Sequence, residues 1–468
     1  MLNGLRRKAA VVAGSKLAAR AEFDRTVGWA LGIRLWSVLS GPVTALLIAS
    51  RFTETEQDFF YTISGLLGLD ALCRLGLFEV LVALTSHASA EANRSTAEGR
   101  NARRRLAGLV RFAGKWSLLS GAAFAVGVGS FGAWSLSGTE GVTPPSSGWS
   151  GPWWVAALCT AGSVAVTPAL AALSGCGRIH AVTRTQTLAA IAGTVATWTV
   201  MLSSGSLWAL AAACAGRLTI EITLLARSRG FLSGLAEGES GAFRWLRDVW
   251  PMQWRAAVQS SAAAAAAAGL TLVLFQHRDA LGAGEAGRLG MSWSAALALQ
   301  LGGSAWLGTR APRLGAFAAA GDRADFDRLF ARVFVVSWIV VAAGAAVGTA
   351  IVWGLNLWGV SLAERVLPPT AFAALVGGTV GLHLPLSFAA AARAWRAEAF
   401  VLQAVGLWGA VALATWTLGP RYGAEGVAWG YCGAVWLVGV PLFLHRWAGW
   451  RRRLDVKLSG EPAPSRRN

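Results

Sequence analysis

The sequence has few charged residues and no concentration of cysteine. Only 14% of its 468 residues are Asp, Glu, Lys or Arg, whereas 54% are hydrophobic. The five cysteines lie in or beside apolar runs and form no Cys-x-x-Cys pair, a common signature of zinc and redox sites. We therefore expect no metal or other cofactor, and we interpret the cysteines as small packing residues. Charge this sparse is typical of a membrane protein rather than a soluble one.

Motifs for catalysis are also missing. The one Gly-Lys pair, Gly114-Lys115, is followed by Trp116, so no nucleotide-binding P-loop is present. His-Glu-x-x-His does not occur, and no loop between apolar runs is long enough for a catalytic domain. The acidic residues expected in the outer loops are isolated from one another: Glu140, Asp279, Glu285 and Glu364. The sequence therefore favours a protein that is not an enzyme.

Positive charge, in contrast, is in excess, with a formal net charge of +18. Nucleic-acid binding is one explanation of such an excess, but arginines in the loops of a membrane protein also fix its orientation. We favour the second explanation and expect no nucleic-acid partner. Residues 1–26 are too long and too basic for the first part of a cleavable signal. We expect them to form a basic arm at the membrane surface.

Apolar runs recur along the whole chain. A helix needs roughly 20 apolar residues to cross a bilayer, and about twelve runs meet that requirement. The predicted spans are 27–49, 59–85, 109–135, 152–174, 185–203, 205–226, 257–276, 289–309, 333–354, 371–391, 399–418 and 425–445. The sequence therefore predicts an all-α integral membrane protein with about 12 transmembrane helices.

The arginines and lysines between these spans test the count. If the N-terminus is cytoplasmic, 34 of the 42 Lys and Arg fall in segments on the cytoplasmic side. Five fall on the other side, and three lie inside spans. An incorrect number of spans would destroy this alternation. We therefore expect a multi-pass protein of the cytoplasmic (inner) membrane with both termini cytoplasmic.

The two halves of the chain resemble each other at a shift of 218 residues. Gly205 and Cys214 move onto Gly423 and Cys432, and the last four spans of the first half land on those of the second. Six spans per half give both halves the same orientation, as in transporters with parallel repeats. We expect two pseudo-symmetric six-helix bundles around a central cavity. The predicted parts are a basic arm (1–26), an N-terminal bundle (27–226), an amphipathic connector (227–256), a C-terminal bundle (257–445) and a basic tail (446–468).

Charged residues inside the predicted spans are the candidate site. Asp70 and Arg74 stand four residues apart, and so do Arg217 and Glu221, which places each pair on one face of a helix. A charged residue at mid-bilayer costs roughly 2.5–3.5 kcal/mol on insertion scales, so such residues usually pair or line a polar path. Both interpretations remain open: ion pairs that only stabilise the bundle, or a path through the membrane.

The arginines and the carboxylates have separate predicted roles. We assign substrate binding to the cations Arg34, Arg74 and Arg217, because the guanidinium fork binds two oxygens of a phosphate at once. We assign charge balance, or binding of protons or Na⁺ as a coupling ion, to Asp70, Glu79 and Glu221. Snorkelling of Arg34 and Arg217 to the cytoplasmic surface is the alternative.

Two short regions resemble polysaccharide (O-antigen type) flippases of the multidrug/oligosaccharidyl-lipid/polysaccharide exporter superfamily. The first region carries the turn Glu54, Glu56 and Gln57, the aromatic run Phe59-Phe60-Tyr61 and Leu75-Gly76-Leu77. The second is the Gly-x-x-Gly-x-Ala opening of the last span, within residues 422–436. The sequence departs from the family at Arg74, where an acidic or neutral residue is common. That departure adds positive charge near the expected path of an anionic headgroup.

The resemblance implies two six-helix bundles that form a V and export a lipid-linked oligosaccharide of the polyprenyl-pyrophosphate type by alternating access. Membrane lipids and polysaccharide-assembly enzymes are the expected partners. A cation-coupled multidrug antiporter of the same superfamily is the first alternative, although three arginines would repel cationic drugs. A membrane glycosyltransferase or polymerase is an alternative of another class. A non-transporting scaffold that recruits synthesis enzymes is the last.

Overall fold

The computed structural model describes residues 28–29, 32–33, 35–37, 39–92, 97–137, 148–204, 206–236, 245–395 and 397–459. The regular structure in these ranges is helical, and no strand occurs in them. Residues 39–51 form the helix before α2. The elements up to α9 are α2 (Glu54–Leu67), α3 (Asp70–Arg74), α4 (Leu77–Ala92), α5 (Ala97–Ala123), η1 (Phe124–Val128), α6 (Gly129–Ser137), α7 (Ser150–Leu173), η2 (Ser174–Arg178), α8 (Ile179–Ser203) and α9 (Trp208–Ala236).

The second part of the chain is equally helical. Its elements are α10 (Trp245–Asp248), α11 (Trp250–Gln276), α12 (Arg278–Leu281), α13 (Glu285–Ala320), α14 (Arg323–Leu357), η3 (Ser361–Arg365), α15 (Pro369–Ala394), α16 (Val401–Gly433), η4 (Ala434–Gly439) and α17 (Val440–Ser459). Helical structure therefore enters the predicted connector from both sides, since α9 continues to Ala236 and α10 begins at Trp245. Similarly, α17 continues the last predicted span into the basic tail.

The predicted all-α membrane fold is confirmed. Seven continuous helical stretches among the described residues are long and apolar enough to cross a membrane. Two of them, Ser150–Ser203 and Val401–Val456, each contain two predicted spans, so the seven stretches account for nine of the twelve. The remaining three correspond to a shorter apolar helix at Leu35–Arg51, the interrupted helices α2 to α4, and α13.

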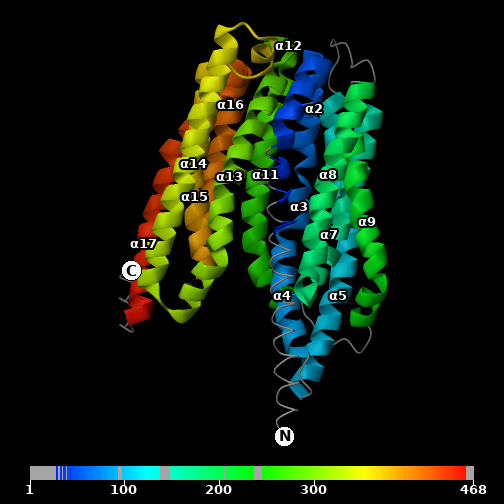
Figure 1. Ribbon diagram of the computed structural model, residues 1–468, viewed down its shortest axis with the longest axis vertical. Helices are drawn as coiled ribbons and strands as arrows, with labels where there is room; N and C mark the ends of the chain where they lie inside the picture. Colours follow the sequence, from blue (N-terminus) through cyan, green and yellow to red (C-terminus); the bar gives the residue numbers. More distant parts are fainter. Residues whose placement is uncertain are drawn as a thin grey trace, which may run out of the picture.

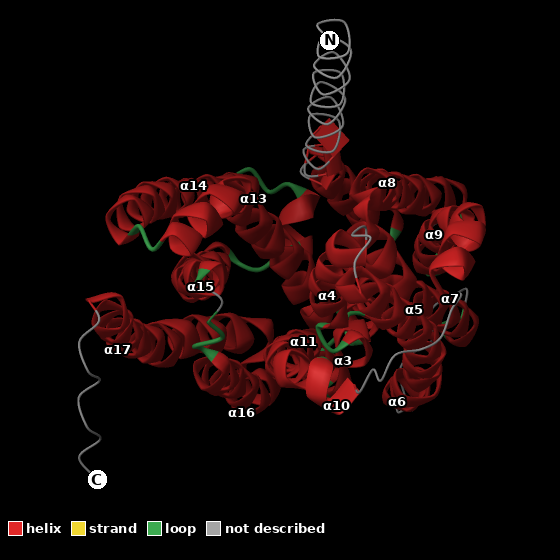
Figure 2. Ribbon diagram, turned by 90° about the horizontal axis from the view of Figure 1, so that it is seen from below, coloured by secondary structure: helices red, strands yellow, loops and turns green. Residues whose placement is uncertain are grey.

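The helices form two groups that run along the long dimension of the molecule (Figure 1). We call α2 to α9 the N-terminal group and α13 to α17 the C-terminal group. The groups meet where α2 and α12 lie, and we call this the joined end. They diverge toward the opposite end, where α5 begins and α17 ends (Figure 1). Seen along the helices, α11 lies between the two groups (Figure 2).

The second predicted span is not one helix but three. After α2, the chain forms the short helix α3, and it then breaks at Leu75 and Gly76, whose φ angles are +49° and +60°. Only glycine adopts this left-handed conformation without strain. A Cβ at Gly76 would also lie 2.7 Å from Cβ of Ala256 in α11. The Leu-Gly-Leu sequence therefore produces a break that packs closely on α11.

Candidate functional site

The break in the second span carries the first predicted ion pair. Arg74 Nη2 lies 2.7 Å from Asp70 Oδ2, and both side chains are about one-quarter exposed. Arg74 ends α3, where a cation is also stabilised by the negative end of the helix dipole. Its Nε is buried and makes no hydrogen bond among the described residues. Part of the hydrogen-bonding capacity of Arg74 is therefore unused.

The second predicted ion pair lies on α9. Arg217 Nε donates to Glu221 Oε1 over 2.9 Å, with the Glu221 side chain 4% exposed and the Arg217 side chain 49% exposed. The other carboxylate oxygen of Glu221 is buried and has no partner among the described residues. The pairs on α3 and α9 therefore both belong to the N-terminal group.

The structure pairs four of the six residues that the sequence singled out. With two arginines and two carboxylates, these four carry a formal charge of zero in total. Arg34 lies outside the described residues. Glu79 belongs to α4, but its side chain lies outside the described part of the structure. The predicted roles of all six residues stay predictions.

A buried polar contact between the two groups lies at the joined end. Asp58 in α2 accepts hydrogen bonds from the backbone N–H of Gly284 over 2.7 Å and of Gly287 over 2.6 Å. These N–H groups belong to the first turn of α13, where the helix dipole favours a negative charge. Asp58 is 2% exposed. The buried Asp58 carboxylate therefore links α2 to the beginning of α13 by two hydrogen bonds.

Further contacts close the same end. Gln57 Nε2 donates to the carbonyl oxygen of Arg365 over 3.0 Å. A Cβ at Gly287 would lie 2.7 Å from Cγ of Gln57, and one at Gly290 would lie 2.3 Å from Cβ of Tyr61. Glycine at these two positions is therefore what allows α2 to approach the α13 backbone.

The cation nearest to this contact does not pair with Asp58. Arg278 lies over the ring of Phe275, at 4.1 Å from its centroid, and makes no ion pair with Asp58 within 4 Å. The partners of the Asp58 carboxylate are therefore the two backbone N–H groups of α13.

Sequence reasoning missed this contact at the joined end. The resemblance included Glu54, Glu56 and Gln57 but not the adjacent Asp58. The one available signal was the Gly-rich turn of residues 282–287, just before a helix start that can bind an anion.

The C-terminal group has ion pairs near the beginnings of α13 and α14, and its interior contains a neutral polar cluster. His383 Nδ1 lies 3.0 Å from Gln300 Nε2, and His383 Nε2 lies 2.9 Å from Ser337 Oγ. Ser337 donates to the carbonyl oxygen of Phe334, so the His383 Nε2–H is the donor to Ser337. All three side chains are buried. The cluster connects α13, α14 and α15 without a formal charge.

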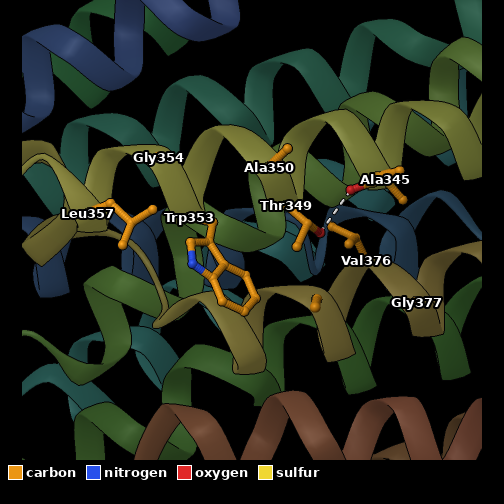
Figure 3. Close-up of a pocket in the computed structure, with 10 residues that line it drawn as sticks. Ala345, Thr349, Ala350, Trp353, Gly354, Leu357, Val376 and Gly377 are labelled. Atoms are coloured by element: carbon orange, nitrogen blue, oxygen red, sulfur yellow. Dashed lines mark hydrogen bonds between the residues drawn. The ribbon is translucent and has the colours of Figure 1, made fainter.

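The same group has an apolar pocket of about 700 Å³ between α14 and α15 (Figure 3). Trp353 and Leu357 lie at one end of the pocket, and Ala345 and Val376 lie toward the other (Figure 3). The Thr349 hydroxyl donates to the carbonyl oxygen of Ala345 over 2.8 Å, so it offers no free donor. The pocket therefore suits hydrocarbon and not a charged headgroup.

Comparisons with known proteins agree with this architecture. No protein-family model and no curated protein sequence matches the chain. Solved structures do match it. A transporter of the MOP superfamily from Pyrococcus furiosus has a TM-score of 0.58 at 12% identity, covering 94% of this chain and 96% of that one. The multidrug transporter DinF-BH of the MATE type, in complex with R6G, has a TM-score of 0.60 at 12% identity, with 95% and 97% covered.

A flippase has the same fold. The lipid II flippase MurJ, in an inward closed conformation, has a TM-score of 0.57 at 10% identity, covering 93% of this chain and 92% of that one. All three structures are described as transporters or flippases. Because the coverage is nearly complete in both directions, the similarity extends over both helix groups. The chain therefore has the fold of MOP superfamily transporters.

Proposed function

We propose that this protein is an alternating-access flippase that moves a lipid-linked oligosaccharide of the polyprenyl-pyrophosphate type across the cytoplasmic membrane for surface polysaccharide synthesis. The fold shared with transporters supports transport by rocking of two helix groups, and the short resemblance to polysaccharide flippases supports the substrate. In this proposal the lipid tail stays in the bilayer while the headgroup passes between the groups.

The observation that carries the proposal is the ion pair at the break of the second span. Discontinuous membrane helices form the binding sites of many transporters, because their ends leave polar groups inside the bilayer. Here the break follows directly after Arg74, whose buried Nε has no partner among the described residues. A pyrophosphate would recruit Arg74 and Arg217 from their carboxylate partners by bidentate hydrogen bonds.

The loop arginines predict how the chain is oriented in the membrane, and this orientation assigns a gating role to the contacts at the joined end. If both termini are cytoplasmic, the joined end faces the outside and the diverging end faces the cytoplasm. The contact between Asp58 and α13 is then the closed outer gate of an inward-facing state. Alternating access requires this gate to open after the cytoplasmic ends approach each other.

A reconstituted flipping assay tests the proposal. Proteoliposomes with a labelled polyprenyl-pyrophosphate oligosaccharide would compare wild type with Arg34→Ala, Arg74→Gln and Arg217→Gln. We expect Arg74→Gln to slow flipping at least about tenfold, since a hydrogen bond to a charged group is worth roughly 1.5–3 kcal/mol. Arg328→Gln is the matched control, because Arg328 forms an exposed ion pair with Asp325. Wild-type protein that is folded but flips no such lipid contradicts the proposal.

A multidrug antiporter is the second candidate, and one observation favours it. The two described ion pairs carry no net formal charge, so they would repel a cationic drug less than unpaired arginines would. The matching MATE structure was solved in complex with R6G. Extrusion of a cationic dye by membranes that contain this protein, combined with no flipping of the lipid-linked oligosaccharide, would favour this candidate.

A further inference from the structure

A second apolar pocket lies where the broken second span meets α11, and we call it the α11 pocket. Its volume of about 380 Å³ is at the lower end of the range of ligand pockets, roughly 300–1,000 Å³. The break and the first turns of α11 supply the residues that line it: Leu75, Trp250, Trp254, Ala257, Val258 and Ser261. Because α3 and α10 lie beside α11 (Figure 2), the pocket belongs to the boundary of the N-terminal group.

The lining side chains of α11 form one stripe along the helix. Starting from Trp250, the others follow at spacings of four, seven, eight and eleven residues, which places them on one helical face. Trp250, Trp254 and Val258 are each between 37% and 38% exposed. An aromatic belt explains tryptophans at a membrane surface, but not an apolar stripe that continues into the predicted span from residue 257. The stripe is therefore open to a ligand that enters from the bilayer.

The aromatic wall of the pocket is held in place from behind. Trp250 packs against Trp245 of α10, with their ring centroids 4.9 Å apart. Trp245 Nε1 donates to Gln253 Oε1 over 3.0 Å, and the Trp245 ring stacks on Trp116 of α5 at 5.9 Å. Rings that are fixed in this way lose little freedom when a ligand binds, which favours binding. The pocket is therefore preorganised.

Cations adjoin the residues that line the pocket. The exposed Arg255 places its guanidinium over the ring of Trp254, at 5.4 Å from its centroid. Leu75 directly follows Arg74, whose buried Nε has no partner among the described residues. Apolar walls next to two cations are complementary to a ligand that joins a hydrocarbon chain to an anionic group. A pyrophosphate carries more negative charge than the phosphodiester of a membrane phospholipid, so two arginines favour the pyrophosphate.

We propose that the α11 pocket is the loading site for the lipid part of the substrate, and that it binds the isoprene units next to the pyrophosphate. The inference rests on the proposed function. In the predicted orientation the pocket lies near the cytoplasmic end of α11, on the side from which the substrate enters. Arg255 attracts the pyrophosphate at the membrane surface, and the isoprene units seated against Leu75 then bring it to Arg74.

Photo-cross-linking in proteoliposomes tests this inference. A photoreactive p-benzoylphenylalanine would replace Val258 in the pocket or, in the matched control, Val335 of α14. These residues are 38% and 50% exposed, and both lie near the cytoplasmic start of a predicted span. With a labelled polyprenyl-pyrophosphate oligosaccharide, we expect at least about tenfold more cross-linking at position 258 than at position 335. Unlabelled polyprenyl phosphate should compete, and the same amount of phosphatidylglycerol should not.

Two substitutions show whether the pocket itself is responsible. Ser261→Leu places a larger apolar side chain in the pocket, so cross-linking at position 258 should fall at least about tenfold. Arg255→Gln should reduce it by a smaller factor and remove part of its salt dependence, because salt screens exposed charges. Gly377→Leu, in the pocket between α14 and α15, is the control and should leave it unchanged.

Two results overturn the inference. Equal cross-linking at positions 258 and 335 would show that the α11 pocket does not select the substrate. Equal competition by phosphatidylglycerol would show that it holds only bulk membrane lipid.

The outcome is separable from the flipping assay. Selective cross-linking in a protein that flips no lipid-linked oligosaccharide would reject the proposed function and keep the pocket as a binding site for prenyl pyrophosphates. Normal flipping without selective cross-linking at position 258 would reject the loading site and keep the transport function.

Discussion

The two helix groups use different chemistry in their interiors. The N-terminal group contains the ion pairs Asp70–Arg74 and Arg217–Glu221, and among the described residues Arg74 Nε and Glu221 Oε2 have no hydrogen-bond partner. The C-terminal group contains the neutral cluster around His383 and a pocket lined by apolar side chains. The ion pairs of the C-terminal group lie near the ends of its helices, at Glu285–Arg288 and Arg323–Asp327, so the contrast concerns the positions farther inside the two groups.

Under the proposed function, this difference assigns the polar headgroup to the N-terminal group. A buried ion pair is a poor way to stabilise a bundle, because desolvation offsets most of its Coulomb energy. A neutral hydrogen-bond cluster connects helices at a lower desolvation cost. Retaining two ion pairs with unused donors and acceptors in the N-terminal group is therefore easier to explain by ligand or ion binding than by stability. The C-terminal group has the properties of a scaffold.

The largest expected change in the free energy of unfolding comes from removing one partner of the Arg217–Glu221 pair. Arg217→Leu leaves the nearly fully buried Glu221 without a cation, and loss of one partner of a buried pair costs roughly 3–5 kcal/mol. Because Arg217 itself is half exposed, we expect a loss of about 2–3 kcal/mol in the free energy of unfolding. Denaturant unfolding of the protein in nanodiscs would measure it.

The double variant Arg217→Leu/Glu221→Leu is the control for this prediction. It removes both charges, so we expect most of the lost stability to return while transport stays impaired. Equal destabilisation by the single and double variants would mean that the pair contributes through packing, and the contrast between the two groups would then lose its ionic basis.

Substitutions in the neutral cluster around His383 should have an intermediate effect on the free energy of unfolding and little effect on transport. His383→Ala removes the partner of Gln300 and of Ser337 and leaves a cavity, so we expect the free energy of unfolding to fall by about 2–3 kcal/mol. Flipping per folded molecule should remain near the wild-type rate, because the hydrogen bonds of the cluster within the described part of the chain all stay inside the C-terminal group. Ser337→Ala, which removes a single hydroxyl, should cost only about 1 kcal/mol. A folded His383→Ala protein with no transport would show that the C-terminal group is more than a scaffold.

Local features of the N-terminal group could be predicted from the sequence. A spacing of four residues places two side chains on one helical face, and both predicted pairs form. Span positions followed from runs of apolar residues because a bilayer sets a minimum helix length. The internal break of the second span was not predicted, since the glycine at its centre stands in an otherwise continuous apolar run. The conformation of Gly76 depends on its close contact with Ala256 of another helix.

The contact at the joined end could not be predicted for a different reason. Asp58 and Gly284 are separated by 226 residues, and their contact depends on how the two groups are placed. A sequence shows that a carboxylate and a helix start both exist, but not that they meet. The same limit applies to His383 and Gln300, which lie 83 residues apart. Charge patterns along a helix are therefore predictable, while partners between helices require the tertiary structure.

The smallest expected change in the free energy of unfolding comes from filling the apolar pocket between α14 and α15. Gly377 lines it, and a Cβ at this position would meet no atom within 4 Å, so Gly377→Leu should extend into the pocket without a clash. Replacing a helical glycine by leucine favours the helix by up to about 1 kcal/mol, and we expect a gain of that order with unchanged flipping. Gly409→Leu on α16 is the matched control, because a Cβ there also meets no atom within 4 Å. If Gly377→Leu slows flipping while Gly409→Leu does not, the pocket holds hydrocarbon that matters for transport. The substrate would then contact both groups, its headgroup in the charged half and its tail in the neutral one.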